Sequence, residues 1–279
     1  MTAEATPPEV YESQLERRAR RNYKIKAAAG RVLLIVGVLA FWQFASGRLI
    51  DAFFVGSPAG VLSVLARDLV DPRFYEDLRV TGIEMGLGYL FGAVGGVALG
   101  VLFGRWRLAA DIVDPFFAAL NSLPRIALAP LLIVWFGIDM ASKVVLAATL
   151  VFFLTFYCTL EGIRTVDRAL IDVARLVGAN ERQIFRYVML PGAAAWVISG
   201  LKMSLPYALI GVIVGEFLIS SVGLGYRLNA YSTSYNTNGT FAMLLVMMAL
   251  MMVLNAVMAL LERYALRWRA DANGIPQVV

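Results

Sequence analysis

Side chains able to do covalent or metal chemistry are scarce in this sequence. Among its 279 residues there is no histidine, and the single cysteine, Cys158, lies inside an apolar run. Histidine is the commonest metal ligand and general base, and one cysteine forms no disulfide within the chain. The sequence has no glycine-rich loop followed by Lys and Ser or Thr, so it holds no recognisable ATP site. These absences predict a chain that is not an enzyme and binds no metal or other cofactor of its own.

The most suggestive spacing lies in a polar segment, residues 161–191, which separates two long apolar runs and holds five arginines. Apolar residues recur at helical steps along its first half: Val166, Leu170, Val173 and Val177. Gly178 suits the left-handed position just past the end of that helix. Asn180 is placed to cap a second helix, with Gln183 completing a capping box. Pro191 is expected to end this second helix and begin the next apolar run.

The two short helices of this segment have two possible roles. They could lie on lipid headgroups, or they could dock into a groove of another protein. Surface-bound helices usually bury bulky Trp, Phe or Leu, whereas the first helix offers mainly Val, Ala and Leu. Asp172 shares a face with Arg168 and Arg175 and can pair with either, which adds about 0.2–0.5 kcal/mol. The small apolar residues and the compact glycine turn favour docking.

The composition is that of a membrane protein. Hydrophobic residues make up 59% of the chain and charged residues 16%, and the mean hydropathy is +0.71. Soluble domains contain about 45–50% apolar and about 25% charged residues. The net charge of +5 does not indicate nucleic acid as a partner, because the basic residues cluster beside the ends of apolar runs, as they do at a lipid bilayer.

Six segments are candidates to cross the bilayer, which takes about 20 helical residues. They are residues 31–46, 80–104, 112–136, 142–160, 193–219 and 241–260. Backbone hydrogen bonds must be closed within lipid, so each is expected to be a helix. The sequence therefore predicts an all-α, polytopic membrane fold. Its first and shortest span is expected to be a permanent anchor rather than a cleaved signal.

The distribution of basic residues predicts the orientation of the chain. With the N-terminus inside, the cytoplasmic segments hold 17 of the 25 basic residues. The outer loops keep six: Arg48, Arg67, Arg73, Arg79, Lys143 and Arg227. The positive-inside rule thus predicts that both termini and the polar segment lie in the cytoplasm. The chain itself is expected in the inner membrane of the cell. The expected divisions are an N-terminal segment, 1–28, a six-helix domain, 29–264, with a cytoplasmic loop, 161–192, and a tail, 265–279.

The segments outside the spans are expected to differ in structure. Residues 1–25 are expected to be disordered or to form a surface helix. Residues 50–77 should lie outside and include a short amphipathic helix capped by Ser57. The second outer loop, 220–240, is rich in Ser, Thr, Asn, Gly and Tyr.

Ionisable residues within spans cost about 2.5–3.5 kcal/mol at the helix centre, so each needs an explanation. The main cases are Glu84, Lys202 and Glu216. Lys202 either extends to the cytoplasmic edge of the bilayer or lines a solute path. Glu216 either makes a buried hydrogen bond near the outer surface or lines the same path.

The third span is interrupted by three prolines: Pro115, Pro124 and Pro130. Near them lie the polar residues Asn121, Ser122 and Arg125. Carbonyl groups freed by proline in mid-membrane can line a cavity, or the kink can serve packing alone. For an anionic solute, Arg125 is the expected cationic contact.

Small and flexible side chains predict packing rather than chemistry in two other spans. Glycines recur every four residues along the second span: Gly88, Gly92, Gly96, Gly100 and Gly104. This spacing allows close helix contact, within the chain or at a dimer seam. Six methionines between residues 243 and 258 are interpreted as pliable packing rather than a soft-metal site.

The segment 161–191 resembles the EAA loop of ATP-binding-cassette importer permeases. The resemblance is carried by Asp172-Val173-Ala174, then Gly178, and then Ile184 and Leu190-Pro191. Asp172 stands where the family has glutamate and Val173 where it has its first alanine. In that family the loop forms coupling helices that sit in a cleft of a cytoplasmic ATPase. The resemblance implies the following ATPase-coupling residues: Asp172, Val173, Ala174, Arg175, Gly178, Ala179, Asn180 and Gln183.

The resemblance extends over about residues 80–252 and narrows to one subfamily. The third span, with NSLPRIALAPL at 121–131 and WFG at 135–137, looks like that of nitrate, taurine and aliphatic-sulfonate permeases. The fifth span and outer loop are similar as well, with GEF at 215–217 and GLGY at 223–226. The resemblance implies a type I importer fold, a homodimer, an extracytoplasmic solute-binding protein, and two ATPase subunits that bind ATP and Mg.

These observations predict the permease subunit of an ATP-driven, binding-protein-dependent importer for a small anion such as a sulfonate, taurine or nitrate. The candidate path residues are Asn121, Ser122, Arg125, Lys202 and Glu216. One alternative keeps the importer and changes the cargo to a thiamine-pyrimidine precursor, an aromatic carboxylate or a riboflavin-like compound. The other is a self-sufficient ion-coupled carrier, which predicts broken helices in both halves and a paired intramembrane charge site.

Overall fold

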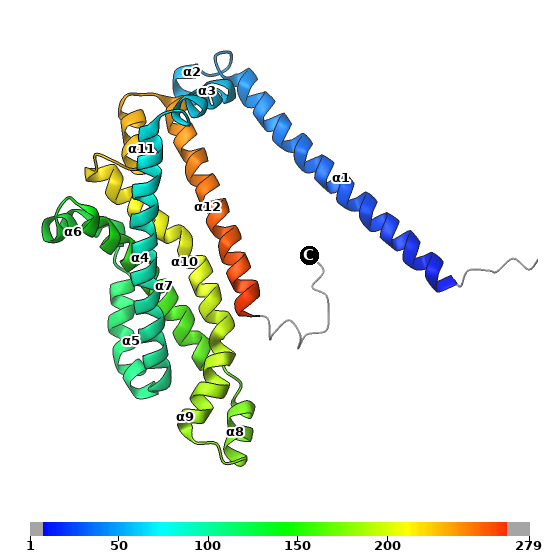
Figure 1. Cartoon of the computed structure of the whole chain (residues 1–279), viewed down its shortest axis with the longest axis vertical. Helices are drawn as coiled ribbons and strands as arrows, with labels where there is room; N and C mark the ends of the chain where they lie inside the picture. Colours follow the sequence, from blue (N-terminus) through cyan, green and yellow to red (C-terminus); the bar gives the residue numbers. More distant parts are fainter. Residues whose placement is uncertain (1–7, 267–279) are drawn as a thin grey trace, which may run out of the picture.

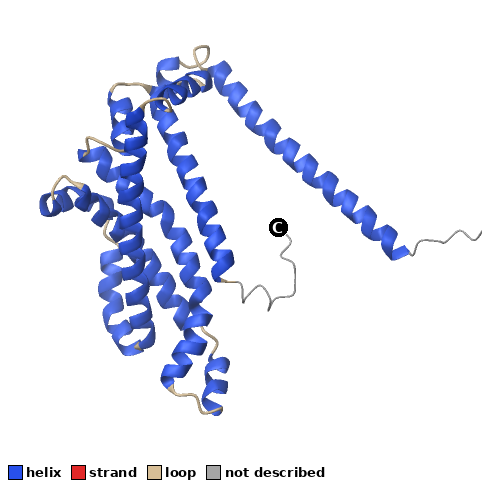
Figure 2. Ribbon diagram, viewed as in Figure 1, coloured by secondary structure: helices blue, strands red, loops and turns tan. Residues whose placement is uncertain are grey.

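The computed structural model describes residues 8–266, and this part of the chain is helical throughout, apart from turns and one isolated bridge (Figure 1, Figure 2). The predicted all-α fold is confirmed. The expected tail, 265–279, falls almost wholly outside the described residues, as do the first seven residues of the expected N-terminal segment.

Within the described residues, five helices are long and apolar enough to cross a membrane. They are α1 (Pro8–Ala45), α4 (Pro72–Arg105), α7 (Met140–Arg164), α10 (Leu190–Ile219) and α12 (Thr237–Ala265). They contain the predicted second, fourth, fifth and sixth spans and all but the last residue of the first. Within α1 the apolar stretch is Ile25–Ala45, and the helix continues back to Pro8, so the alternative of disorder is wrong for residues 8–25.

The predicted third span is not one helix. It consists of α5 (Arg107–Asn121), a 3₁₀ turn, η1 (Arg125–Leu128), and α6 (Ala129–Phe136). The two halves are bent by 77° at a break between residues 121 and 125. Pro124 lies in this break, where it has no N–H to offer a helix and disfavours helical backbone in the residue before it. Pro115 stays inside α5, so only one of the three prolines coincides with the bend.

Helices α4, α7 and α10 form the centre of the molecule, with α7 packed against both of the others. The glycines of α4 allow this closeness. A methyl group added at Gly92 would lie 2.7 Å from Val151 Cβ, and one added at Gly100 would lie 2.6 Å from Thr159 Cβ. The predicted tight seam is therefore confirmed, and it lies between two helices of the same chain.

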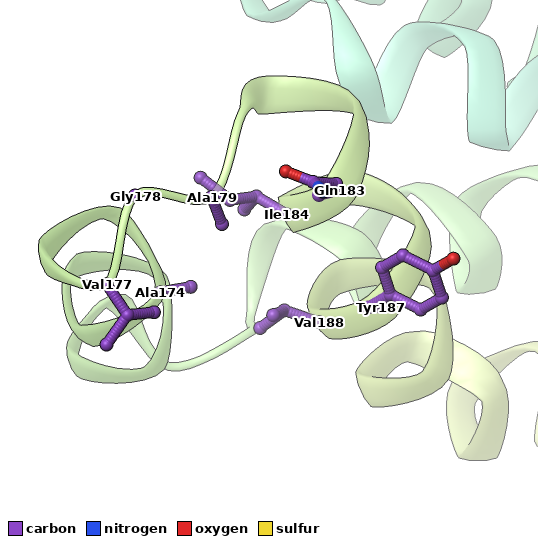
Figure 3. Close-up of a pocket in the computed structure, with 8 residues that line it drawn as sticks. All are labelled: Ala174, Val177, Gly178, Ala179, Gln183, Ile184, Tyr187 and Val188. Atoms are coloured by element: carbon purple, nitrogen blue, oxygen red, sulfur yellow. The ribbon is translucent and has the colours of Figure 1, made fainter.

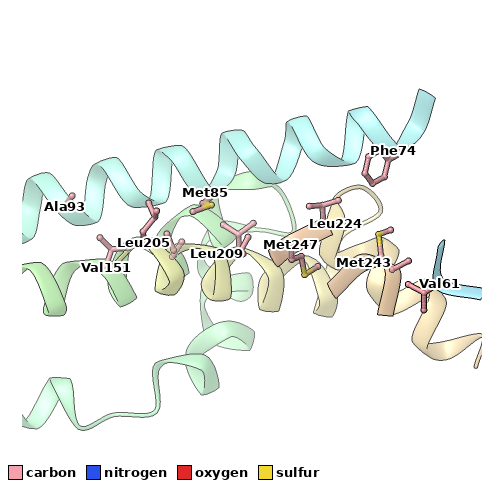
Figure 4. Packing of buried hydrophobic residues seen from close by; sticks show 14 residues of the cluster. Val61, Phe74, Met85, Ala93, Val151, Leu205, Leu209, Leu224, Met243 and Met247 are labelled. Atoms are coloured by element: carbon pink, nitrogen blue, oxygen red, sulfur yellow. The ribbon is translucent and has the colours of Figure 1, made fainter. Parts of the chain in front are cut away.

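The main apolar core joins the outer halves of these helices to the outer segments (Figure 4). Met85 on α4 and Leu209 on α10 are buried there, together with Met243 and Met247 on α12. Val61 closes the cluster from α3 (Pro58–Asp68). Met243 and Met247 thus pack as predicted, whereas Met248 and Met252 are exposed.

Three short helices lie at the outer end, at the top of Figure 1: α2 (Ala52–Val55), α3 and α11 (Leu224–Thr233). Ser57 caps α3 by accepting a hydrogen bond of 3.1 Å from the Gly60 N–H, as predicted. Helix α11 occupies the loop 220–240, for which no helix was predicted.

Helix α1 diverges from the rest of the molecule (Figure 1). Near its outer end, Trp42 Nε1 donates to the Val55 carbonyl at 3.2 Å, and the centroids of the Trp42 and Phe241 rings lie 5.2 Å apart. Side chains such as Leu33 and Phe41 are exposed. The apolar surface of α1 is therefore left to lipid or to another chain.

Candidate functional site

The polar segment forms a compact hairpin at the end of the molecule opposite α2 and α3 (Figure 1). It contains α8 (Arg168–Leu176), α9 (Glu181–Ile184) and a π-helical turn, η2 (Phe185–Met189), which leads into α10. We call residues 168–189 the hairpin.

Local hydrogen bonds define both ends of α8. Asp167 caps its start by accepting from the Ala169 N–H at 2.9 Å. Beyond its end Gly178 has φ +85°, a left-handed conformation that costs residues with a Cβ about 1–2 kcal/mol. The predicted glycine stop is confirmed.

The predicted capping box is also present. The Asn180 side chain accepts from the Gln183 N–H at 2.9 Å, and the Gln183 side chain accepts from the Asn180 N–H at 2.8 Å. Arg175 then joins the two helices, because its guanidinium contacts Asp172 at 3.7 Å on α8 and Glu181 at 3.2 Å on α9. The turn between the helices is thus held from both sides.

The hairpin presents apolar residues to its surroundings. Leu170 is 58% exposed, Val173 59% and Val177 79%. Beside them is a notch of about 320 Å³, shown in Figure 3. It is lined by Ala174, Val177, Gly178, Ala179, Gln183, Ile184, Tyr187 and Val188. Such a surface on a rigid turn is suited to contact with another protein.

Two details of the hairpin differ from the sequence prediction. Val166 precedes α8 instead of belonging to its apolar face, because the cap at Asp167 starts the helix two residues later. Pro191 ends no helix. It follows the wider π turn of η2 and lies in the first turn of α10, where a missing N–H is tolerated.

The predicted path residues fall into separate places. Asn121, Ser122 and Arg125 meet at the bend between α5 and η1, where the Arg125 guanidinium donates to the Asn121 side chain and to its carbonyl. Arg125 also lies 4.4 Å from the centroid of the Phe153 ring on α7, and its Nε is buried without a partner.

The other two path candidates are engaged elsewhere. Lys202 is exposed and pairs with Glu262 of α12 at 2.8 Å. Glu216 is fully buried, and it accepts from Thr81 Oγ1 and the Gly225 N–H, both at 2.7 Å. The buried hydrogen bond that was one of two interpretations of Glu216 is therefore present, and the five residues do not form one site.

Comparison with known proteins identifies the family. The model of the family described as "Binding-protein-dependent transport system inner membrane component" matches residues 92–267. The chain belongs to this family. It is a multi-pass permease of the inner membrane and the transport subunit of a binding-protein-dependent ABC importer. In such systems a partner ATPase handles ATP.

Curated relatives resemble the permease over most of its length. A putative aliphatic sulfonates transport permease protein of Bacillus subtilis (strain 168) is 31% identical over 87% of this chain and 88% of its own. A riboflavin transport system permease protein of Chloroflexus aurantiacus is 32% identical over 88% of this chain and 91% of its own. A formylaminopyrimidine transport permease protein of Halalkalibacterium halodurans is 28% identical over 90% and 98%.

A solved structure supports the fold. A chain of the MetNI methionine ABC transporter, in inward-facing conformations, matches with a TM-score of 0.53 and 21% sequence identity. The match covers 74% of this chain and 97% of that chain.

The permease contains a buried ion pair that the sequence prediction missed. Lys143 was assigned to an outer loop, but it lies in the first turn of α7, is 5% exposed, and contacts Glu84 of α4 at 2.5 Å. Its ammonium also donates to Ser220 Oγ at 3.2 Å. The sequence did hold a signal for this pair, because Glu84 and Lys143 are opposite charges near the outer ends of two spans. A charge within the membrane requires a partner.

Next to this pair, three side chains bind three successive backbone N–H groups of the outer loop. Asp77 accepts a hydrogen bond from the Gly223 N–H at 2.8 Å, and Thr81 accepts one from the Leu224 N–H at 2.9 Å. Glu216 accepts the bond from the Gly225 N–H already described. Gly223 has φ +122°, which only glycine adopts readily. The two stretches GEF and GLGY, noted separately in the sequence, thus meet in the structure.

Arg227 of α11 completes the outer end of the permease. Its guanidinium contacts Asp77 at 2.7 Å, Asp71 at 3.2 Å and Asp68 at 3.5 Å. Burial alone would lower the pKa of Arg227, but hydrogen bonds and charge from these carboxylates raise it above its ordinary value. We call Asp77, Thr81, Glu84, Lys143, Glu216 and Arg227 the outer cluster.

Proposed function

We propose that this permease works as a homodimer, with both termini cytoplasmic, and carries a small anionic solute such as a sulfonate, taurine or nitrate. Two aliphatic-sulfonate permease relatives at 31% identity support this choice of cargo. The riboflavin and formylaminopyrimidine relatives, at similar identity, are the reason to retain a second candidate class of heterocyclic cargo. We assign residues 1–28 and 265–279 to the cytoplasm.

The hairpin is the proposed contact with the ATPase subunits. The observation that carries this proposal is its exposed apolar surface on a turn held by Gly178, the capping box and Arg175. A partner that covers Val173 and Val177 gains about 25 cal/mol for each Å² of apolar surface removed from water. The coupling residues are Asp172, Val173, Ala174, Arg175, Gly178, Ala179, Asn180 and Gln183.

The proposed cycle transmits motion through the hairpin. When ATP draws the two ATPase subunits together, each hairpin moves with its subunit as a rigid body and shifts the attached spans. A flexible loop would absorb that displacement. The path then opens to the outside, and the binding protein delivers its solute.

Arg125 is the residue proposed to contact an anionic solute. It lies at the bend of the third span, with one guanidinium nitrogen unpartnered. Asn121 and Ser122 share this bend. Lys202 and Glu216 are not proposed as contacts, because each is engaged by other residues.

Cross-linking tests the proposed coupling contact. In a Cys158→Ala background, Arg175→Cys or Asn180→Cys should form a disulfide with a cysteine introduced in the co-expressed ATPase cleft. Arg48→Cys, near the outer end, is the matched control and should give none. Absence of the hairpin cross-links in an assembled, ATP-hydrolysing complex would refute the contact.

Uptake into proteoliposomes tests the cargo. The complex with its ATPase and binding protein should accumulate a radiolabelled alkanesulfonate, taurine or nitrate when ATP is supplied. Arg125→Gln should reduce that uptake while leaving the assembled complex intact. Uptake of riboflavin or a formylaminopyrimidine, with no uptake of anions, would support the second candidate class.

A further inference from the structure

A basic pocket lies between the hairpin and the adjacent ends of α4 and α7. It has a volume of about 420 Å³, and its charged lining consists of Arg105, Arg164, Arg168, Arg175, Asp111 and Glu181. We call it the arginine pocket. Four guanidinium groups thus face two carboxylates.

The carboxylates engage only two of the four arginines. Arg164 contacts Asp111 at 3.2 Å, and Arg175 contacts Glu181 at the same distance. Arg105 lies 5.4 Å from the centroid of the Phe185 ring and has no acidic partner within residues 8–266. In the same described range the side chain of Arg168 makes neither a hydrogen bond nor an ion pair and is exposed. The pocket therefore retains two cationic groups that no residue in the described part of the chain neutralises.

An apolar groove runs between α4 and α10 on the membrane side of the pocket. Its volume is about 480 Å³, and it is lined by Val97, Val101, Leu190, Pro191, Ala194, Val197 and Ile198. Both helices are long and apolar enough to cross the membrane, and we infer that the groove faces the hydrocarbon region at its inner edge. We call it the acyl groove.

Neighbouring residues line the groove and the pocket on both walls. Val97, Val101 and Arg105 follow one another at steps of four, so they share one face of α4. On the other wall, Leu190 of the groove directly follows Met189 of the pocket. The guanidinium groups of the pocket thus lie next to the end of the groove.

We propose that this combined site binds an anionic phospholipid of the leaflet next to the hairpin, with its phosphate in the arginine pocket and one acyl chain in the acyl groove. Guanidinium groups bind phosphate oxygens in a bidentate manner. Basic pockets at the cytoplasmic ends of spans suit acidic headgroups. A free phosphate or sulfonate would account for the arginines but would leave the apolar groove unexplained.

Native mass spectrometry of the permease bound to its ATPase tests the proposal. Phosphatidylglycerol should bind more tightly than phosphatidylcholine with the same acyl chains. The double variant Arg105→Gln/Arg168→Gln should weaken phosphatidylglycerol binding about tenfold, because it removes two charge-assisted contacts. Arg182→Gln, which alters an exposed hairpin arginine outside the pocket lining, is the matched control and should bind lipid normally. Equal binding of the two lipids, or unchanged binding by the double variant, overturns the proposal.

Filling the acyl groove distinguishes the possible occupants. Ala194→Trp should weaken phosphatidylglycerol binding and leave inorganic phosphate binding unchanged. Ala194→Leu serves if the tryptophan variant does not assemble. Unchanged phosphatidylglycerol binding, with phosphate as an effective competitor, would mean that the ligand is a free anion.

Two further outcomes would also overturn the proposal. If the groove variant dissociates the permease dimer without affecting lipid, a helix of a second copy occupies the groove. If Arg105→Gln/Arg168→Gln releases the ATPase and keeps the lipid, the pocket belongs to the ATPase interface.

Discussion

The two ends of the permease satisfy their charged groups in opposite ways. In the outer cluster Glu84, Lys143 and Glu216 are at most 5% exposed and are bound by partners on other helices of the same chain. In the hairpin Arg168, Asp172 and Arg175 are all exposed. The outer cluster thus pairs its buried charges within one chain, although one oxygen of Glu84 has no partner. The hairpin instead leaves charged and apolar groups exposed.

This difference indicates where each end derives its stability. Buried polar groups are costly unless they are all paired, so the outer cluster tolerates little change. The hairpin is held mainly by local caps and one arginine, and it can be altered without unfolding the spans. Mutations at the outer end should therefore act on stability, and mutations in the hairpin on coupling.

The largest effect is expected from Lys143→Met. The substitution leaves the Glu84 carboxylate buried without its partner, which costs about 3–5 kcal/mol. The thermal unfolding midpoint of the purified permease should fall sharply, and Lys143→Met/Glu84→Leu should recover much of the loss.

Lys202→Met is the matched control for that prediction. Its pair with Glu262 is partly exposed, so the loss should be about 0–1 kcal/mol. Equal losses for the two lysine variants would contradict the contrast between buried and exposed pairs.

The next largest effect is expected from Gly178→Val. A branched side chain at φ +85° strains the turn by about 1–2 kcal/mol and should uncouple ATP hydrolysis from uptake in proteoliposomes. Gly47 has φ +80° and equally open surroundings at the outer end, so Gly47→Val carries a similar strain. Uptake should survive Gly47→Val; normal uptake by the Gly178 variant would defeat the mechanical role of the turn.

Loss of a helix cap gives a smaller effect at both ends. Asn180→Ala and Ser57→Ala each remove one cap, at a cost of about 1 kcal/mol. Similar shifts in unfolding midpoint are expected, but only Asn180→Ala should lower the ATPase stimulation that accompanies transport. A transport defect in both variants would show that the two ends are not separable.

The smallest effect concerns acid stability at the outer end. The backbone N–H of Arg73, and then Arg227, lower the pKa of Asp71. A carboxyl with a lowered folded-state pKa contributes stability above its unfolded pKa of about 3.9 and loses it as pH falls through the folded-state value. At pH 7 the thermal unfolding midpoint of Asp71→Asn should therefore lie slightly below that of the unaltered chain. The difference between the two midpoints should vanish at the most acidic pH. A difference that grows on acidification would contradict this sign.

Local chemistry made much of the hairpin predictable. Gly178, Asn180 and Gln183 act through neighbours within a few residues, so their roles follow from spacing alone. The five unbroken spans were predictable as well, because hydropathy is also a property of consecutive residues. The third span was harder, because three prolines were candidates for the break and only Pro124 lies at it.

Contacts between distant segments were not predictable in the same way. The pair of Lys143 and Glu84 depends on how α4 and α7 align, which a single sequence does not specify. Helix α11 has a loop-like composition, and its position follows from tertiary bonds of Arg227 to Asp77 and of Tyr231 to Asp68. Tertiary context outweighed local preference there.

The π turn of η2 has a mechanical consequence for the whole permease. Because η2 continues into α10, residues Glu181–Ile219 form one helical rod of 39 residues. At about 1.5 Å per residue the rod is about 58 Å long, and tilting it about ten degrees around its middle carries each tip about 5 Å in opposite directions. Gln183 lies near one end of this rod and Glu216 near the other. A single tilt of the rod would therefore narrow the proposed solute path at one side of the membrane and widen it at the other.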